Sequence, residues 1–159
     1  MAFSFRRVVT GHDANGRATV LFDDIKTSAP STRPAHASCV AWSSPTAVPT
    51  TTGADDASLV PVPTSLEQGS IFRIVEYSPG VAPRNHRTSS LDYAVVLSGE
   101  IDMELDDGLV VHLRAGDVLV QRATIHNWVN NGTETCRIAF VLIGAHPALA
   151  AGAPLPAVG

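Results

Sequence analysis

Basic charge, cysteine and long apolar runs are all scarce in this sequence, and each scarcity excludes a class of protein. The 159 residues hold 11 lysines and arginines against 15 aspartates and glutamates, so the net charge is −4. No basic stripe is present, which excludes nucleic acid as the expected partner. No apolar run is long enough to span a bilayer, and the N-terminus turns polar before the apolar region of a signal peptide could form. We therefore expect a cytoplasmic protein without a membrane partner.

The two cysteines, Cys39 and Cys136, stand far apart and in no spacing typical of a metal or redox motif. Two reduced, structural thiols are the favoured interpretation for a cytosolic chain, and a disulfide between them is the alternative. A chain of 159 residues is long enough to bury a hydrophobic core within one domain.

What the sequence does contain is a series of short strand patterns separated by turn residues. Glycine, proline, threonine and valine are common, and no long helical pattern appears, which is typical of an all-β sandwich or barrel. Turn signals stand at Gly99, Asp107-Gly108 and Ala115-Gly116. Because so many short strands follow one another, we expect two facing sheets or a closed barrel. The predicted strands cover residues 71–77, 92–98, 100–105, 109–113, 117–122, 125–129 and 136–143.

The segments on either side of this series are predicted to be additions to a barrel. Phe5 to Asp24 has the pattern of a β-hairpin around Asn15-Gly16, a dipeptide that favours type I′ turns. This hairpin would cover either its own barrel or that of a partner chain. Residues 26–68 are rich in proline, so regular elements there are short. This segment is either a wrap around a pocket or a connection along the surface. The expected units are 1–69 for the hairpin and arm, 70–146 for the barrel and 147–159 for a loose tail.

The spacing of glycine and histidine residues from Gly80 onward resembles the two motifs of the cupin superfamily. The first motif is Gly, five residues, His-x-His, three or four residues, Glu, six residues and Gly. Here Gly80 is followed at the same spacing by His86, Thr88, Asp92 and Gly99. Thr88 therefore stands in the place of the second histidine, and Asp92 in the place of the glutamate.

The second cupin motif is Gly, five residues, Pro-x-Gly, two residues, His, three residues and Asn. In this chain Gly116 is followed by Arg122 and Thr124 in the places of proline and glycine. His126 comes one residue early, and Asn130 keeps the last interval. The resemblance implies an all-β fold, the double-stranded β-helix or jelly-roll barrel. It also implies a homodimer, which the unpaired edges of a barrel sheet favour independently.

Three candidate metal ligands, His86, Asp92 and His126, are expected to converge in the mouth of this barrel. Two imidazoles and a carboxylate with open positions suit one divalent transition metal, namely Fe(II), Mn, Ni or Zn. The alternative is a pocket without metal, in which His86 or His126 is a general acid or base and Asp92 fixes its tautomer. Thr88 would then donate a hydrogen bond from the vacated ligand position.

Two further residues are candidates for contact with substrate. Arg122 would bind a carboxylate or phenolate if it faces inward, and would make a surface ion pair if it faces outward. Trp128 has the same strand parity as His126, so it either lines the pocket or belongs to the core.

The predicted function is that of a small-molecule enzyme, because the resemblance is to short cupins of secondary metabolism. It implies an organic acid or polyketide-like substrate and lyase, decarboxylase, dehydratase, isomerase or oxygenase chemistry. One alternative is a ligand-binding cupin without catalysis, in which His86 and His126 would not converge. The other is a structural protein, which the polar residues at the motif positions disfavour. A fold alone does not decide among these chemistries.

Overall fold

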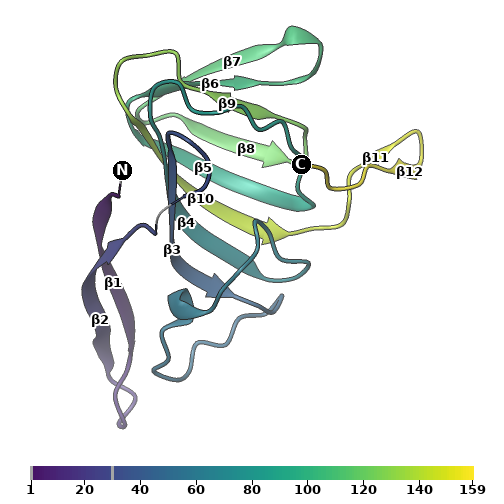
Figure 1. The fold of residues 1–159 in the computed structure, drawn as a ribbon. Coiled ribbons are helices and arrows are strands. Elements are labelled where there is room, and N and C mark those ends of the chain that lie inside the picture. The colour runs from purple at the N-terminus through teal and green to yellow at the C-terminus, as the bar shows by residue number, and fades with distance from the viewer. Residues whose placement is uncertain (1, 30) are drawn as a thin grey trace.

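The structure is a computed structural model that describes residues 2–29 and 31–159 (Figure 1). Its regular elements are almost all strands, with short 3-10 turns at Ala57–Leu59 and Asp106–Gly108. The strands are β1 (Ser4–His12), β2 (Ala18–Thr27), β3 (His36–Ser44), β4 (Ser70–Tyr77), β5 (Ser90–Ser98), β6 (Glu100–Glu104), β7 (Val110–Arg114), β8 (Val118–Arg122), β9 (Asn127–Val129), β10 (Cys136–Gly144), β11 (Leu149–Ala150) and β12 (Ala153–Pro154).

Two antiparallel sheets face each other and form the barrel. One has five strands in the order β3-β4-β10-β5-β8, and the other has three in the order β7-β6-β9. The non-consecutive order is that of a double-stranded β-helix, which confirms the predicted fold class. β3 pairs with β4 over its whole length, so the barrel sheet takes a strand from the segment that was predicted to be a separate arm.

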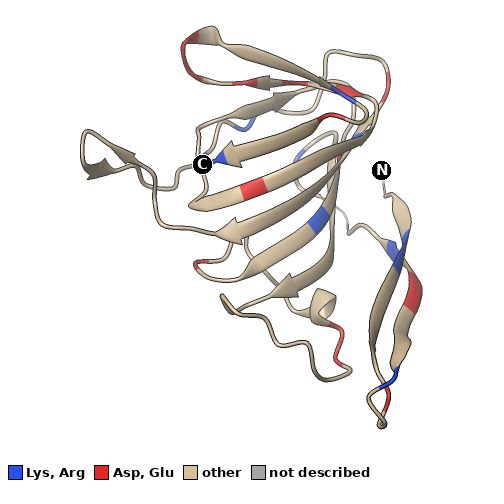
Figure 2. Cartoon of the chain, turned by 180° about the vertical axis from the view of Figure 1, so that it is seen from behind, with Lys and Arg blue, Asp and Glu red and all other residues tan. Residues whose placement is uncertain are grey.

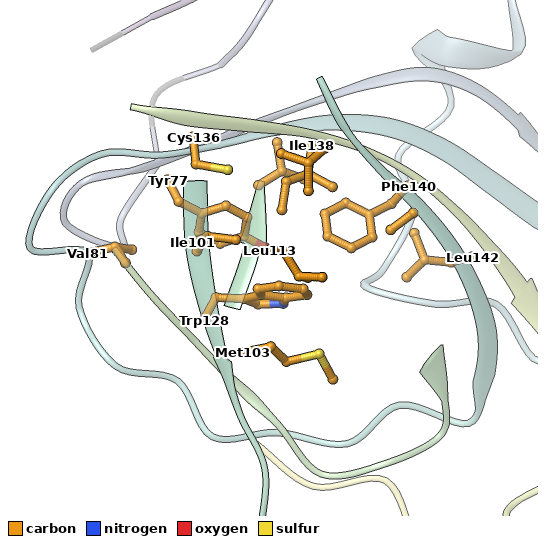
Figure 3. Packing of buried hydrophobic residues seen from close by; sticks show 13 residues of the cluster. Tyr77, Val81, Ile101, Met103, Leu113, Trp128, Cys136, Ile138, Phe140 and Leu142 are labelled. Carbon is orange, nitrogen blue, oxygen red and sulfur yellow. The ribbon is translucent and has the colours of Figure 1, made fainter. Parts of the chain in front are cut away.

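The core lies between the two sheets because strand residues alternate between faces. In β10 the inward residues Cys136, Ile138, Phe140 and Leu142 are all buried. They pack with Trp128 and with inward residues of the opposite sheet, as Figure 3 shows. Cys39 and Cys136 are both free thiols, as the favoured interpretation of the sequence expected.

The N-terminal hairpin of β1 and β2 projects from the barrel and is anchored at its base (Figure 1). Phe3 is buried against β3 and β4 on the outer face of the large sheet. Arg7 is buried as well, and its guanidinium forms ion pairs with Asp24 and Asp56 at 2.6 and 2.7 Å. The predicted type I′ turn is wrong, because in the turn only Gly16 has a positive φ, and its N–H donates to the carbonyl of Asp13.

The C-terminal tail is not the loose end that its composition predicted. β11 and β12 form a small hairpin, after which the chain returns to the barrel. The N–H and C=O groups of Val158 exchange hydrogen bonds of 3.0 Å with those of Arg87, and the guanidinium of Arg84 donates to the carbonyl of Gly159 at 2.9 Å. The tail thus lies as a short extra strand beside the segment that carries His86.

Charged residues are unevenly distributed over these elements. Figure 2 shows basic and acidic segments close together on the hairpin, and much longer uncharged stretches on the barrel strands. Within the large sheet, β4 carries a basic segment and β5 an acidic one (Figure 2). In the described parts of the chain, 2–29 and 31–159, no helix is long and apolar enough to cross a membrane.

Candidate active site

The centre of the candidate site is a pair of histidines that the fold brings together from distant segments. His86 and His126 form an isolated antiparallel bridge, in which each backbone N–H donates to the other's carbonyl at 3.0 Å. Their ring centroids are 4.4 Å apart with an interplanar angle of 48°. Both residues are buried, with 8% and 4% of their surface exposed. The structure therefore brings together two of the three predicted ligands.

A strained turn delivers His126 to this position. Ala123 has a φ of 51°, in the left-handed region that a side chain with a Cβ rarely adopts. The turn occupies the place of the family's Pro-x-Gly, and Ala123 takes the left-handed conformation one residue before the position of the glycine. This shift accompanies the arrival of His126 one residue early.

Hydrogen bonds to the backbone orient both imidazoles. Nδ1 of His86 lies 3.0 Å from the carbonyl oxygen of Arg84, and Nδ1 of His126 lies 3.0 Å from that of Thr124. A carbonyl oxygen only accepts, so each bond requires a protonated Nδ1. In that tautomer the Nε2 lone pair of each ring is left to accept a proton or to bind a ligand.

Burial keeps both rings neutral near pH 7. Burial, with the neighbouring ring of His126 as the next cause, lowers the pKa of His86 to about 4. The pKa of His126 is lowered too, again mainly by burial. Two neutral imidazoles can stand side by side without the repulsion that two imidazolium ions would suffer.

Gln121 contacts His126 at the ring nitrogen that distinguishes its two tautomers, a contact that the sequence did not reveal. Its Nε2 lies 2.9 Å from the carbonyl oxygen of Thr124 and 3.0 Å from Nδ1 of His126. An amide nitrogen only donates, so it bonds to Nδ1 only when that atom is unprotonated. The bond from Gln121 and the bond from Nδ1 to Thr124 are therefore alternatives, and they leave Nε2 of His126 as a donor or an acceptor respectively.

Asp92 ends a chain of buried hydroxyl groups on the inner face of the large sheet. The hydroxyl of Ser90 donates to Oδ1 of Asp92 at 2.6 Å, and Thr88 lies 2.8 Å from Ser90 through their hydroxyl oxygens. Burial raises the pKa of Asp92 to about 6, against the lowering effects of the Ser90 hydroxyl and the charge of Arg73. A carboxyl group with such a pKa can exchange a proton near neutral pH.

The three predicted ligands do not form one ready metal centre. Across residues 2–29 and 31–159, no group of three or more histidine, cysteine, aspartate or glutamate side chains could hold a metal ion. His86 and His126 could supply two nitrogen ligands, whereas catalytic zinc centres generally use three protein ligands. The residues present therefore do not fit a three-ligand centre, and we assign no chemical step to a metal.

The two predicted substrate contacts lie in different environments. Trp128 is buried, with its ring 5.8 Å from that of His126 in an edge-on arrangement and 5.8 Å from that of Tyr77. It belongs to the core and also borders the histidine pair. Arg122 is exposed, on the opposite face of β8 from the buried Gln121, so it does not line the interior.

Sequence reasoning missed other polar residues of the interior. Gln121 is paired with Asp92 across β8 and β5, and strand alternation from Asp92 could have identified it and Ser90. The ring of His36 faces that of Tyr77, with 5.6 Å between the ring centroids. No local signal could have found this contact, because it depends on the pairing of β3 with β4.

A buried imidazole pair and a carboxyl group inside a small double-stranded β-helix define a class, that of single-domain barrels with a polar site in the interior. Comparison with known proteins agrees. The family model of the cupin domain matches residues 73–143. The chain is 38% identical over 156 residues to phomopsin biosynthesis cluster protein C′ of Diaporthe leptostromiformis, over 89% of this chain and 79% of that protein.

Two other relatives extend the comparison. The cupin-domain-containing oxidoreductase fogC of Aspergillus ruber is 37% identical over 144 residues, with 86% of this chain and 71% of that protein covered. The polyketide cyclase RemF of Streptomyces resistomycificus has a TM-score of 0.51 and 17% identity, over 73% of this chain and 70% of that one, a likeness of fold alone. The chain belongs to the cupin family, and the first of these relatives is named for a biosynthesis cluster.

Proposed function

We propose that this protein is an enzyme of secondary metabolism that transfers protons on a small organic acid or polyketide-like metabolite. The observation that supports this most is the pair of neutral, buried imidazoles of His86 and His126. Their convergence is the feature that a binding cupin without catalysis was not expected to show. The relatives named for biosynthetic clusters support the metabolic setting.

The proposed roles follow from the state of each group. Asp92 has a pKa of about 6, so it can take a proton from substrate as carboxylate and return it as carboxylic acid. Nε2 of His126 or His86 accepts or donates the second proton, according to the tautomer. Thr88 and Ser90 hold the Asp92 carboxyl in place through their hydroxyl chain. Such chemistry covers isomerases, dehydratases and other lyases.

A second candidate function is oxidation, because several relatives are named oxidoreductases. This candidate needs dioxygen as the oxidant, and His86 and His126 would supply two nitrogen ligands to a divalent transition metal that activates it. Metal binding thus remains a prediction that elemental analysis of untagged protein decides.

Proton exchange with solvent tests the first proposal on a panel of simple compounds, so the natural substrate does not have to be identified first. Small aryl and keto carboxylic acids are incubated with the protein in D₂O, and loss of C–H signals is followed by NMR. We expect exchange with the wild type, at least a hundredfold slower exchange with His126→Ala and Asp92→Asn, and an unchanged rate with His112→Ala. His112 is a matched control, since it is exposed and bonded to Asp102 at the barrel surface.

Two outcomes would decide against proton transfer. Exchange that is equally fast in His126→Ala and in the wild type would remove the histidine from the mechanism. Stoichiometric iron, manganese, nickel or zinc that is lost in both His86→Ala and His126→Ala, together with oxygen consumption, would favour the oxidoreductase.

We also propose that the protein is a homodimer in which apolar surface on the hairpin meets the outer face of the large sheet. Val20 and Ile25 on β2 are exposed, as are Val118 and Val120 on β8. Val120→Glu and Val20→Glu should each give a monomer in light scattering. Val48→Glu, at an exposed loop position, should leave the mass unchanged. A wild-type monomer at 100 μM would contradict this proposal.

A further inference from the structure

Two arginines, Arg33 and Arg73, border the inner face of β4, and neither belongs to the site described above. Arg73 lies on the inner face of β4, beside Phe140 of β10. The guanidinium of Arg33 is 5.9 Å from the ring centroid of Tyr77. Tyr77 lies on the same face of β4 as Arg73, because strand residues alternate between faces. Arg33 and Arg73 therefore border the same inner face, and the charges of both lower the pKa of Tyr77, which burial raises.

No acidic side chain in the described parts of the chain forms an ion pair with these cations. Salt bridges in residues 2–29 and 31–159 involve other basic groups. The charge of Arg73 lowers the pKa of the interior carboxyl group of Asp92, but the two side chains form no ion pair. Guanidinium groups that are drawn into low dielectric without a counter-ion destabilise a fold. Within the described residues, neither arginine is therefore neutralised by an ion pair.

The hydrogen bonds of these arginines are incomplete as well. Nη2 of Arg33 and Nε of Arg73 are buried without a hydrogen-bond partner. Their other donors bind backbone oxygens, from Arg33 to Ala82 at 2.8 Å and from Arg73 to Pro63 and Thr64 at 2.9 and 3.1 Å. These carbonyl groups satisfy donors and hold the guanidinium planes, but they carry no net charge. Buried donors without partners are rare enough to require an explanation.

We propose that Arg33 and Arg73 form the subsite that binds the carboxylate of the substrate. A carboxylate supplies both missing elements, the negative charge and acceptor oxygens in a geometry that matches a guanidinium fork. The subsite lies close to the histidine pair, because the ring of Trp128 is 5.8 Å both from that of Tyr77, which Arg33 covers, and from that of His126. The inference rests on the proposed function and deepens it, and it replaces Arg122 as the residue that selects an acid.

Binding of benzoate, with benzamide as its uncharged counterpart, tests the subsite. Affinities are measured by calorimetry in a buffer free of chloride and phosphate. We expect saturable binding of benzoate to the wild type and at least tenfold weaker binding of benzamide. Arg73→Gln and Arg33→Gln should each weaken benzoate binding at least tenfold. Arg114→Gln, an exposed site on β7, removes the same charge and should change it less than twofold.

Further variants separate this inference from the proposed function and from misfolding. His126→Ala should retain benzoate binding within threefold although proton exchange is lost. Arg73→Lys keeps the charge and is expected to bind with intermediate affinity, so it replaces Arg73→Gln if that variant does not fold. Equal binding of benzamide, an equal loss in Arg114→Gln, or no saturable binding of benzoate, oxalate or acetate by the wild type would overturn the inference.

Discussion

The two halves of the barrel interior differ in what fills them. Around Ile138 the inward residues are apolar and fully buried, and they include Val75 and Val96 on the neighbouring strands. Around Leu142, a few residues along the same strand, the cross-strand neighbour on β5 is Asp92. The first half is built for stability. The second half keeps polar groups that are costly to bury, which is expected of a site whose function maintains it.

This comparison predicts that substitutions in the apolar half cause the largest loss of stability. Ile138→Ala should lower the free energy of unfolding by roughly 2–5 kcal/mol, because it leaves a cavity among close-packed side chains. Urea denaturation measures the change. Val48→Ala, at an exposed loop position, should cost less than about 0.5 kcal/mol. A loss of stability at Ile138 no larger than at Val48 would contradict this difference between the two halves.

Substitution of Asp92 in the polar half should raise the free energy of unfolding, whereas Ile138→Ala lowers it. Its folded pKa of about 6 lies above the ordinary value of 3.8, so ionisation disfavours the fold as the pH rises through that range. Asp92→Asn should therefore gain about 1–2 kcal/mol over the wild type at pH 7.5 and nothing at pH 3.5. Chemical denaturation at both pH values measures the difference. A variant that is destabilised equally at both would indicate a packing role.

His36 provides a further test of the comparison, because arginine charges act on its titration. Burial, then the charges of Arg33, Arg84 and Arg73, lowers its pKa from 6.5 to about 4. As the pH falls, the unfolded chain binds this proton at a higher pH than the folded protein does. The contribution of His36 to the free energy of unfolding is therefore fully present above about pH 6.5 and is lost as the pH drops toward 4. His36→Gln should flatten this slope by about 1 kcal/mol per pH unit. An unchanged slope in unfolding experiments from pH 7 to 4.5 would show that His36 is not the titrating group.

The smallest expected effect on stability is at Gln121. Gln121→Met loses the bond to Thr124 but also removes a buried Oε1 that has no partner, so the change should stay within about 1 kcal/mol. Its main consequence should be chemical, since Nδ1 of His126 is then free to donate to Thr124 alone. Nitrogen-15 NMR of the imidazole should show a single Nδ1–H tautomer in the variant. Detection of the Nε2–H tautomer would refute this control by Gln121.

Much of the fold was predictable from local pattern. Alternation over residues 136–143 and the turn at Asp107-Gly108 located β10 and the hairpin of β6 and β7 to within about a residue. The tail was not predictable, because β11 and β12 are short and the bond from Val158 to Arg87 depends on where the barrel ends. The turn of the N-terminal hairpin is not the predicted type I′ turn. The carboxylate of Asp13 accepts hydrogen bonds from the N–H groups of Asn15 and Arg17 and so stabilises another turn type.

The residues of the candidate site were predictable only where they stand at positions of the two cupin motifs. His86 and His126 were identified from the sequence and do converge. Asp92 faces the same interior but joins a hydroxyl chain. Its replacement of glutamate shortens the side chain, which agrees with a group that does not complete a three-ligand set within the described residues.

By itself, the sequence determined an all-β barrel of the cupin type, the pairing of strands through its turns and the two histidines, because these depend on residue alternation and on spacing along one chain. Only the tertiary structure decided which polar groups share the interior. Arg33 and Arg73 come from separate segments, and each by itself resembles a surface residue. Their common environment arises from strand pairing across the sheet, and the lack of an acidic partner among the described residues becomes visible only when their neighbours in space are known.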